Sequence, residues 1–245
     1  GEPQPARQPS GSAGLDFDGQ QPLQRDGQRQ PFGAGLVEHR GQRLGGRDKG
    51  LVALQGRPLI AHIAERLAPQ VGAMLISANR NAADYAPYGT VIADSVPGQP
   101  GPLAGLLAGL DHCPGDWLLA VPCDALGLPL DLGRQLARAA SAAGVKAAYA
   151  QIGDDALYPC CLLHRDLQPA LDAWLRGGQR AVRHWLHAEG AIAVPLRGWR
   201  ADMFNLNTEA DLARATRRLD PGRSEGKSGG GCGGRSGGGS DPAAD

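Results

Sequence analysis

The sequence predicts an α/β fold in which helices cover both faces of a mostly parallel sheet. Short apolar runs of strand character alternate with amphipathic runs of helical period between about residues 51 and 219. The connections between these runs are short, as in successive βα units. Ala, Leu and Val supply most of the apolar residues, and aromatic residues make up only 4% of the chain. This composition suits helices that pack closely on a sheet.

Individual elements follow from local signals. Pro58 suits the first position of a helix, Gly144 is well placed to stop one, and Thr208 with Asp211 has the spacing of a capping box. Residues 51–54 read as a short extended segment, and 35–37 read only as the end of a strand. We expect strands at 71–77, 90–93, 117–121, 145–150, 158–163 and 191–196, and helices from residues 58 and 102 and at 131–143, 166–175, 179–188 and 208–219.

Composition excludes several classes of protein. Twenty-five Lys and Arg balance 25 Asp and Glu, which argues against a general nucleic-acid binder or an anionic-membrane binder. No apolar run reaches the roughly 20 residues of a membrane span, and we expect a cytoplasmic protein. The five cysteines form no Cys-x-x-Cys pattern. We expect the first four, Cys113, Cys123, Cys160 and Cys161, to be small buried apolar residues.

The two ends of the chain differ in composition from its centre. Residues 1–34 are rich in Gln, Gly, Pro and Arg without a structural period, which predicts a disordered or aberrant segment. Residues 220–245 are mostly Gly and Ser, which predicts a flexible tail. The folded domain is therefore expected at 35–219.

A glycine-punctuated basic loop, Arg43-Leu44-Gly45-Gly46-Arg47-Asp48-Lys49-Gly50, is the first candidate for binding chemistry. Paired glycines let backbone amides approach a ligand closely, and the cations have no run of acid beside them. The spacing matches neither the Walker A loop nor Gly-x-Gly-x-x-Gly. Either the loop binds phosphate and Lys49 clamps phosphoryl oxygens, or it is a basic turn with a solvated lysine.

Polar residues follow several predicted strands. Asn79, Asp94 and Asp124 each stand at the carboxyl end of a strand, which is the edge where parallel α/β sheets bind ligands. Asp124 suits a magnesium ion completed by water and phosphates, or else caps a turn. Asp94 suits a nucleotide base or sugar, or caps the next turn. The amides of the 101–105 loop suit a base, or simply begin a helix.

The order and spacing of seven motifs resemble the molybdenum cofactor guanylyltransferases, a family of nucleotidyltransferases. Gly-Gly-x-Asp-Lys-Gly at 45–50 and Pro-Gly-Pro-Leu-Ala-Gly at 100–105 are the most specific of them. The first of these is part of the longer motif Arg43-Leu44-Gly45-Gly46-Arg47-Asp48-Lys49-Gly50. The resemblance extends from Gly41 to about Arg214, and the other five motifs are Gly56-Arg57-Pro58-Leu59, Ala78-Asn79-Arg80, Asp94-Ser95, Pro122-Cys123-Asp124 and Asn205-Leu206-Asn207-Thr208.

The resemblance implies a Rossmann-like three-layer α/β/α nucleotidyltransferase fold and a reaction. GTP and the molybdopterin cofactor would give the guanine dinucleotide form and pyrophosphate, with Mg²⁺ required and transient contact with molybdoenzymes or their chaperones. Lys49, Arg43 and Asp124 would be catalytic, and Asp124 would bind the metal. Asn205 and Asn207 would lie near the pterin or the metal. The implied nucleotide-binding residues are Gly45, Gly46, Lys49, Ser77, Asn79, Asp94, Gly101, Pro102, Leu103, Gly105 and Asp124.

Two other functions remain open. One is a related nucleotidyltransferase that uses CTP or a sugar phosphate, which Pro-Gly-Pro-Leu-Ala-Gly disfavours. The other is a catalytically impaired protein that binds nucleotide or cofactor for delivery to molybdoenzymes.

The chain departs from the family's pattern at its first strand. The family runs an apolar strand directly into Leu-Ala-Gly-Gly, whereas this chain has Gly35-Leu36-Val37-Glu38-His39-Arg40 there. We therefore expect the first strand to be missing or altered. If the sequence is as written, we expect the sheet to lack a central strand and GTP to lose several backbone donors, with weak or absent activity. Our hypothesis for the abrupt change is either a shifted upstream reading frame or a mispredicted start.

Overall fold

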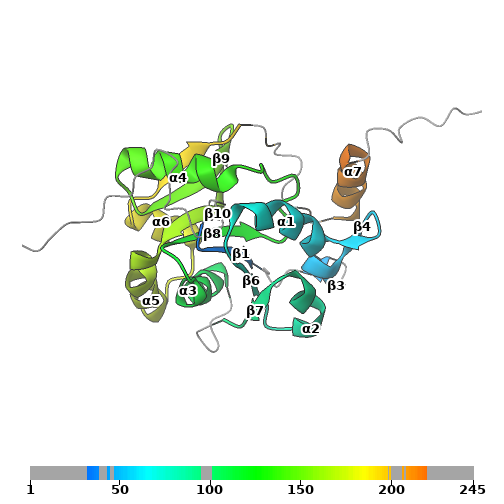
Figure 1. Cartoon of the computed structure of the whole chain (residues 1–245), viewed down its shortest axis with the longest axis horizontal. Coiled ribbons are helices and arrows are strands. Elements are labelled where there is room, and N and C mark those ends of the chain that lie inside the picture. The colour runs from blue at the N-terminus through cyan, green and yellow to red at the C-terminus, as the bar shows by residue number, and fades with distance from the viewer. Residues whose placement is uncertain are drawn as a thin grey trace, which may run out of the picture.

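The computed structural model of the chain describes residues 32–38, 43–44, 47–94, 101–197, 199, 206 and 208–219. Seven strands form its central sheet: β1 (Ala34–Glu38), β6 (Met74–Ser77), β7 (Thr90–Ile92), β8 (Trp117–Pro122), β9 (Ala147–Ile152), β10 (Asp155–His164) and β11 (Ile192–Pro195). Their spatial order is β11-β9-β10-β8-β1-β6-β7, and β10 alone among them runs antiparallel to its neighbours (Figure 1). The predicted fold class, a mostly parallel sheet in an α/β protein, is confirmed.

Helices pack on both faces of this sheet and divide the core into two layers (Figure 1). The helices are α1 (Leu59–Leu67), α2 (Ala82–Tyr85), α3 (Pro102–His112), α4 (Leu132–Ala143), α5 (Gln168–Arg176), α6 (Val182–Ala188) and α7 (Glu209–Leu219). Apolar residues of α1, α4 and α7 join one core cluster, and those of α3, α5 and α6 join the other. This arrangement is the predicted three-layer α/β/α architecture.

Short elements complete the fold. Two small antiparallel ribbons pair β2 (Arg43–Leu44) with β3 (Arg47–Asp48) and β4 (Ala53–Leu54) with β5 (Arg57–Pro58). Single 3₁₀ turns are η1 (Lys49–Leu51), η2 (Ala68–Gln70), η3 (Ala86–Tyr88) and η4 (Arg165–Leu167). The extended segment expected at 51–54 is therefore shorter, because Leu51 closes a 3₁₀ turn and β4 begins at Ala53.

The expected absence of a central strand is wrong. β1 lies in the middle of the sheet, all five of its residues are buried, and it pairs in parallel with β6 on one side and β8 on the other. Ala34 and Leu36 pack toward α3, while Val37 packs toward α1. Two complete ladders and three apolar side chains are sufficient to form the strand, although its composition differs from that of the family.

Several local predictions are confirmed. The Thr208 amide donates to Asp211 Oδ2 at 2.8 Å, and the Asp211 amide donates to Thr208 Oγ1 at 3.1 Å, which is a reciprocal capping box. Gly144 has a φ of 64° and ends α4 in the left-handed conformation. Cys113, Cys123, Cys160 and Cys161 are all buried. None of the described helices is long and apolar enough to cross a membrane.

Candidate active site

Three neighbouring strands end together at one edge of the sheet. Glu38, the last residue of β1, lies opposite Ser77 of β6 and opposite Pro122 of β8. Because the three strands are parallel, the residues that follow them emerge at this same carboxyl edge. Asn79 and Asp124 come directly after two of these strands, as the sequence predicts.

Lys49 and Asp124 form a buried ion pair at this edge. Lys49 Nζ lies 2.5 Å from Asp124 Oδ2, and the two side chains are only 4% and 3% exposed. Lys49 belongs to η1, and Asp124 comes two residues after β8. The alternative of a solvated lysine is therefore wrong. A pair this far from water is held by the fold rather than by chance contact, because each charge loses its hydration on burial.

The second carboxylate oxygen of Asp124 has a different environment. Asp124 Oδ1 is buried and, among the described residues, has no hydrogen-bond partner. A buried anionic oxygen without a partner is unfavourable, and such atoms mark places where an ion or ligand completes the site. One oxygen of Asp124 thus pairs with Lys49, and the other has no hydrogen-bond partner in the part of the chain that the structure describes.

A clamp formed by Asp48, Tyr85 and Asn81 holds the turn that carries Lys49. Tyr85 Oη donates to Asp48 Oδ1 at 2.5 Å, and Asn81 Nδ2 donates to Asp48 Oδ2 at 2.8 Å. Burial, followed by the hydrogen bond to Asp48, raises the pKa of Tyr85 well above its ordinary value. Tyr85 therefore remains a donor at neutral pH. A Cβ placed on Gly50 would lie 2.4 Å from Tyr85 Oη, so the clamp requires glycine there.

A second group of predicted residues meets on the other side of β1. Asn79 Nδ2 donates to Asp94 Oδ2 at 2.7 Å, and the Asp94 amide donates back to Asn79 Oδ1 at 3.0 Å. Ser77 Oγ lies 3.3 Å from Asp94 Oδ1. These bonds fix the position of the Asp94 carboxylate.

The first turn of α3 covers the same place. A Cβ placed on Gly105 would lie 2.9 Å from Ser77 Oγ and 3.2 Å from Glu38 Oε1, so only glycine lets the helix approach this closely. Pro102 occupies the first turn after Gly101, the N-cap residue. Leu103 is 1% exposed and packs in the core. Its side chain is structural, and the contribution of this loop to a ligand would come from backbone amides.

Some predicted site residues lie outside the described part of the chain. These are Gly45, Gly46, Asn205 and Asn207, together with the side chain of Arg43, whose backbone forms β2. Residues 1–31 of the predicted N-terminal segment and residues 220–245 of the predicted tail also lie outside the described part of the chain.

Sequence reasoning missed Glu38 and the Tyr85 clamp. Glu38 is 2% exposed and lies at the end of β1, between the two groups of site residues. The rule that selected Asp124, a polar residue directly after an apolar strand, also applies to Glu38. The clamp joins residues 37 positions apart, and no motif or spacing signals such a contact.

The fold and this edge together define an α/β nucleotide-binding protein whose polar residues gather where parallel strands end. The MobA-like NTP transferase domain model matches residues 35–192, a range that begins within β1. The chain belongs to the MobA-like NTP transferase family.

Two relatives and one solved structure illustrate the similarity. The molybdenum cofactor guanylyltransferase of Serratia proteamaculans is 42% identical over 180 residues, covering 73% of this chain and 90% of that protein. Its counterpart from Cupriavidus pinatubonensis is 44% identical over 183 residues, covering 72% and 92%. The crystal structure of molybdopterin-guanine dinucleotide biosynthesis protein A from Archaeoglobus fulgidus superposes with a TM-score of 0.65 at 22% identity, covering 77% and 99%.

Proposed function

We propose that the protein transfers GMP from GTP to the molybdopterin form of the molybdenum cofactor, giving molybdopterin guanine dinucleotide and pyrophosphate. The observation that carries this proposal is the buried pair of Lys49 and Asp124, a cation and a carboxylate at the carboxyl edge of the sheet. Two relatives named molybdenum cofactor guanylyltransferase, each more than 40% identical, support it.

The chemistry needs charge neutralisation and alignment more than a strong base. An oxygen of the acceptor phosphate attacks the α-phosphorus of GTP, and the bond from that phosphorus to the oxygen of the leaving pyrophosphate breaks. Lys49 Nζ is the cation that would bind the triphosphate and offset the charge that develops on the leaving group. The Asp48 and Tyr85 clamp would keep Lys49 in place, and Asp94 with Ser77 and Asn79 would hold the nucleoside.

Mg²⁺ fits the residues present. Asp124 Oδ1 is a buried carboxylate oxygen without a protein hydrogen-bond partner in the described ranges, and it would be the protein ligand. No group of three or more His, Cys, Asp or Glu among the described residues is arranged to hold a metal. Mg²⁺ commonly takes one or two carboxylates, water and substrate phosphates, so a single aspartate is adequate. When bound, the ion would supply further neutralisation of the triphosphate.

The expectation of weak activity rested partly on a missing central strand. Because β1 is present in the centre of the sheet, that reason no longer holds. The other reason, loss of amide donors in the loop after β1, concerns residues outside the described part. We propose an active enzyme in the cytoplasm, where GTP is available, which passes its product to molybdoenzymes or their chaperones by transient contact.

The test is release of pyrophosphate from GTP in the presence of molybdopterin and Mg²⁺. The wild type should release pyrophosphate with GTP and not with CTP, and Asp124→Asn should reduce the rate by about 10²- to 10³-fold. Asp131→Asn, an exposed aspartate before α4, serves as the matched control and should leave the rate unchanged. Binding of GTP without any release of pyrophosphate would instead support the delivery function, and release with CTP would support the related transferase.

A further inference from the structure

The loop that carries Asp124 is buried although it forms neither helix nor strand. Residues 123–129 follow β8, and all of them except Gly127 are buried. A buried backbone carbonyl must find a hydrogen-bond partner, and a loop has no sheet ladder or helical turn to supply one. Donors for this Asp124 loop, residues 123–129, therefore have to come from other parts of the fold.

Side chains from distant segments supply these donors. At the far end of the loop, side chains of α1 and η2 donate to the carbonyl oxygens of Leu128 and Pro129. At the near end, Trp199 Nε1 donates to the carbonyl oxygen of Leu126 at 2.8 Å. Trp199 follows β11 and is 73 positions from Leu126 in the sequence. Because Leu126 comes two residues after Asp124, this bond is, of the three, the one closest in sequence to the carboxylate.

Trp199 differs from the other tryptophans of the chain in what its indole N–H does. The chain has four tryptophans. Three of them bury Nε1 without a hydrogen-bond partner in the described ranges, namely Trp117, Trp174 and Trp185. Trp199 is 6% exposed and shares a core cluster with Leu126, so its ring packs as an apolar group while its N–H donates. Burial of the ring does not by itself require that bond, as the other three tryptophans show.

The position of the Asp124 carboxylate depends on how this loop is held. Lys49 pairs with one carboxylate oxygen, and Oδ1, the oxygen that would bind Mg²⁺, has no hydrogen-bond partner among the described residues. The backbone of the loop therefore sets where Oδ1 lies. Mg²⁺ requires near-ideal octahedral geometry, and groups that orient a metal ligand without touching the metal typically change affinity or activity by about 10- to 100-fold.

We propose that Trp199 is a positioning residue for Asp124. Its indole N–H holds the Leu126 carbonyl, and the loop then presents Asp124 Oδ1 to Mg²⁺ and Oδ2 to Lys49. Trp199 acts through the loop and is not itself a catalytic residue. The inference rests on the proposed function for the role of Asp124, and it adds to the support of the site a residue that follows β11, the edge strand of the sheet.

Two tryptophan variants test this role by steady-state kinetics. Trp199→Phe keeps an aromatic ring in the core and removes the N–H. Trp185→Phe, at a fully buried tryptophan of α6, is the matched control, because it removes the same atoms without breaking a hydrogen bond of the described residues. Trp199→Phe should lower kcat for pyrophosphate release about 10-fold and raise the Mg²⁺ concentration for half-maximal rate by about as much. The KM for GTP at saturating Mg²⁺ should stay within roughly 2-fold of the wild type. Trp185→Phe should change none of the three, and urea unfolding compares the stability of the two variants.

A spectroscopic measurement tests the same link without turnover. Each indole N–H gives its own signal in a ¹H–¹⁵N spectrum of the full chain, and sequence-specific assignment identifies that of Trp199 without any variant. Adding Mg²⁺ and GTP without molybdopterin should shift the Trp199 signal, because an ion bound to Asp124 changes the position of the loop that includes Leu126. The Trp185 signal should stay in place.

The outcomes separate the two proposals. A wild type that neither binds GTP with Mg²⁺ by titration calorimetry nor releases pyrophosphate overturns the proposed function, and the role of Trp199 with it. An active wild type whose Trp199 signal is unmoved by Mg²⁺ and GTP overturns the Trp199 assignment alone, even if Trp199→Phe does not fold. So does a folded Trp199→Phe protein with the kcat and the Mg²⁺ requirement of the wild type. Equal kinetic losses in Trp199→Phe and Trp185→Phe also overturn it, since a general loss of packing would then explain both.

Discussion

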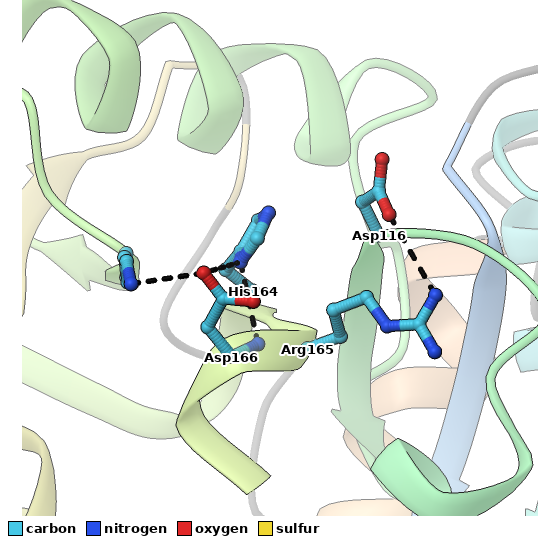
Figure 2. A network of polar contacts seen from close by, with 5 residues as sticks. Asp116, His164, Arg165 and Asp166 are labelled. Atoms are coloured by element: carbon cyan, nitrogen blue, oxygen red, sulfur yellow. Dashed lines mark hydrogen bonds and ion pairs between the residues drawn. The ribbon is translucent and has the colours of Figure 1, made fainter. Parts of the chain in front are cut away.

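The two ends of the central sheet carry ion pairs of the same chemistry in opposite surroundings. At the carboxyl end, Lys49 and Asp124 are 4% and 3% exposed. At the amino end of β8, Lys146 pairs with Asp166 at 2.9 Å and Arg165 pairs with Asp116 at 3.8 Å, all with more than half of each side chain exposed (Figure 2). The distance from the lysine nitrogen to the carboxylate oxygen is similar in the Lys49–Asp124 and Lys146–Asp166 pairs, so exposure to water is the main difference between them.

Exposure decides what each pair contributes. Water screens the exposed pairs, and holding long side chains in one position opposes the small Coulombic gain, so such pairs add little to stability. Burial makes the Lys49 and Asp124 pair costly to assemble and more costly to break, because removing one partner leaves an uncompensated charge. The fold therefore retains the buried pair although its desolvation costs free energy, which is typical of a functional site. The exposed pairs carry no such cost.

Removing one charge at each end should give the largest contrast. Lys49→Met leaves the Asp124 carboxylate buried without its cation, and we expect a loss of about 3–5 kcal/mol in the free energy of unfolding. Lys146→Met at the exposed end should produce no measurable loss. Urea unfolding of both variants, followed by circular dichroism, checks the comparison.

A double variant provides the control. Lys49→Met with Asp124→Leu removes both charges and fills the site with apolar groups, so it should recover most of the stability while remaining inactive. A Lys49→Met protein as stable as the wild type would contradict the expected cost of leaving the buried Asp124 carboxylate without its cation.

Gly50 tests how the buried end is positioned. A Cβ at this residue would lie 2.4 Å from Tyr85 Oη, so Gly50→Ala must displace either the turn that carries Lys49 or the tyrosine. We expect the rate of pyrophosphate release to fall roughly 10- to 100-fold, because small displacements of a catalytic group have effects of this size. Steady-state kinetics at saturating GTP measures the change.

Gly177→Ala, after α5, is the matched control for this substitution. Its Cβ would come no closer than 3.3 Å to an atom of a non-adjacent residue, and its φ of −71° suits any residue. Its rate should equal that of the wild type. An equal loss in both variants would indicate a general effect of added side chains rather than displacement of Lys49.

Tyr85, which helps to position Lys49, should make the stability of the fold decrease at alkaline pH. Burial and the hydrogen bond to Asp48 raise the pKa of Tyr85 above its ordinary value of 10.0. Between the two values the folded state holds a proton that the unfolded state has lost, so stability falls as the pH rises above about 10, by up to about 1.4 kcal/mol per pH unit. Tyr85→Phe should remove this part of the decline, as measured by urea unfolding between pH 8 and pH 11.

Tyr88→Phe, at a half-buried tyrosine three residues further on, is the control and should keep the full decline. Part of the decline should remain in every variant, because burial also raises the pKa of Cys161 and of Cys113. An alkaline profile of Tyr85→Phe that matches the wild type would show that this phenol ionises no differently in the folded and unfolded chains.

The sequence was sufficient for the architecture because its signals are local. Strand and helix periods, Gly144 and the Thr208 capping box each act within a few residues, and the fold confirms them. Asp124 was found by the same means, since any polar residue directly after an apolar strand of a parallel sheet reaches the carboxyl edge.

The rest of the site depends on contacts between distant segments. The bond of Tyr85 to Asp48 spans 37 positions, and that of Lys49 to Asp124 spans 75, so neither has a sequence period that would reveal it. β1 was underestimated for a related reason. Its five residues form a poor strand by themselves, and pairing with β6 and β8 on both sides decides its conformation.

Replacing Asp166, in the exposed Lys146–Asp166 pair, should give the smallest effect on stability, and this effect should depend on pH only in acid. The hydrogen bond from Lys146, with His164 and Lys146 charges adding to it, lowers the pKa of Asp166 below its ordinary value of 3.8 (Figure 2). Its contribution to stability is present above that value and is lost as the pH falls through the lowered pKa, because the unfolded chain binds the proton more readily. Asp166→Asn should therefore lower stability slightly at neutral pH, weaken the pH dependence of unfolding below about pH 4, and leave pyrophosphate release unchanged. Acid titration followed by circular dichroism measures the profile. A loss of stability at pH 7 comparable to that of Lys49→Met would remove the distinction between the two ends of the sheet.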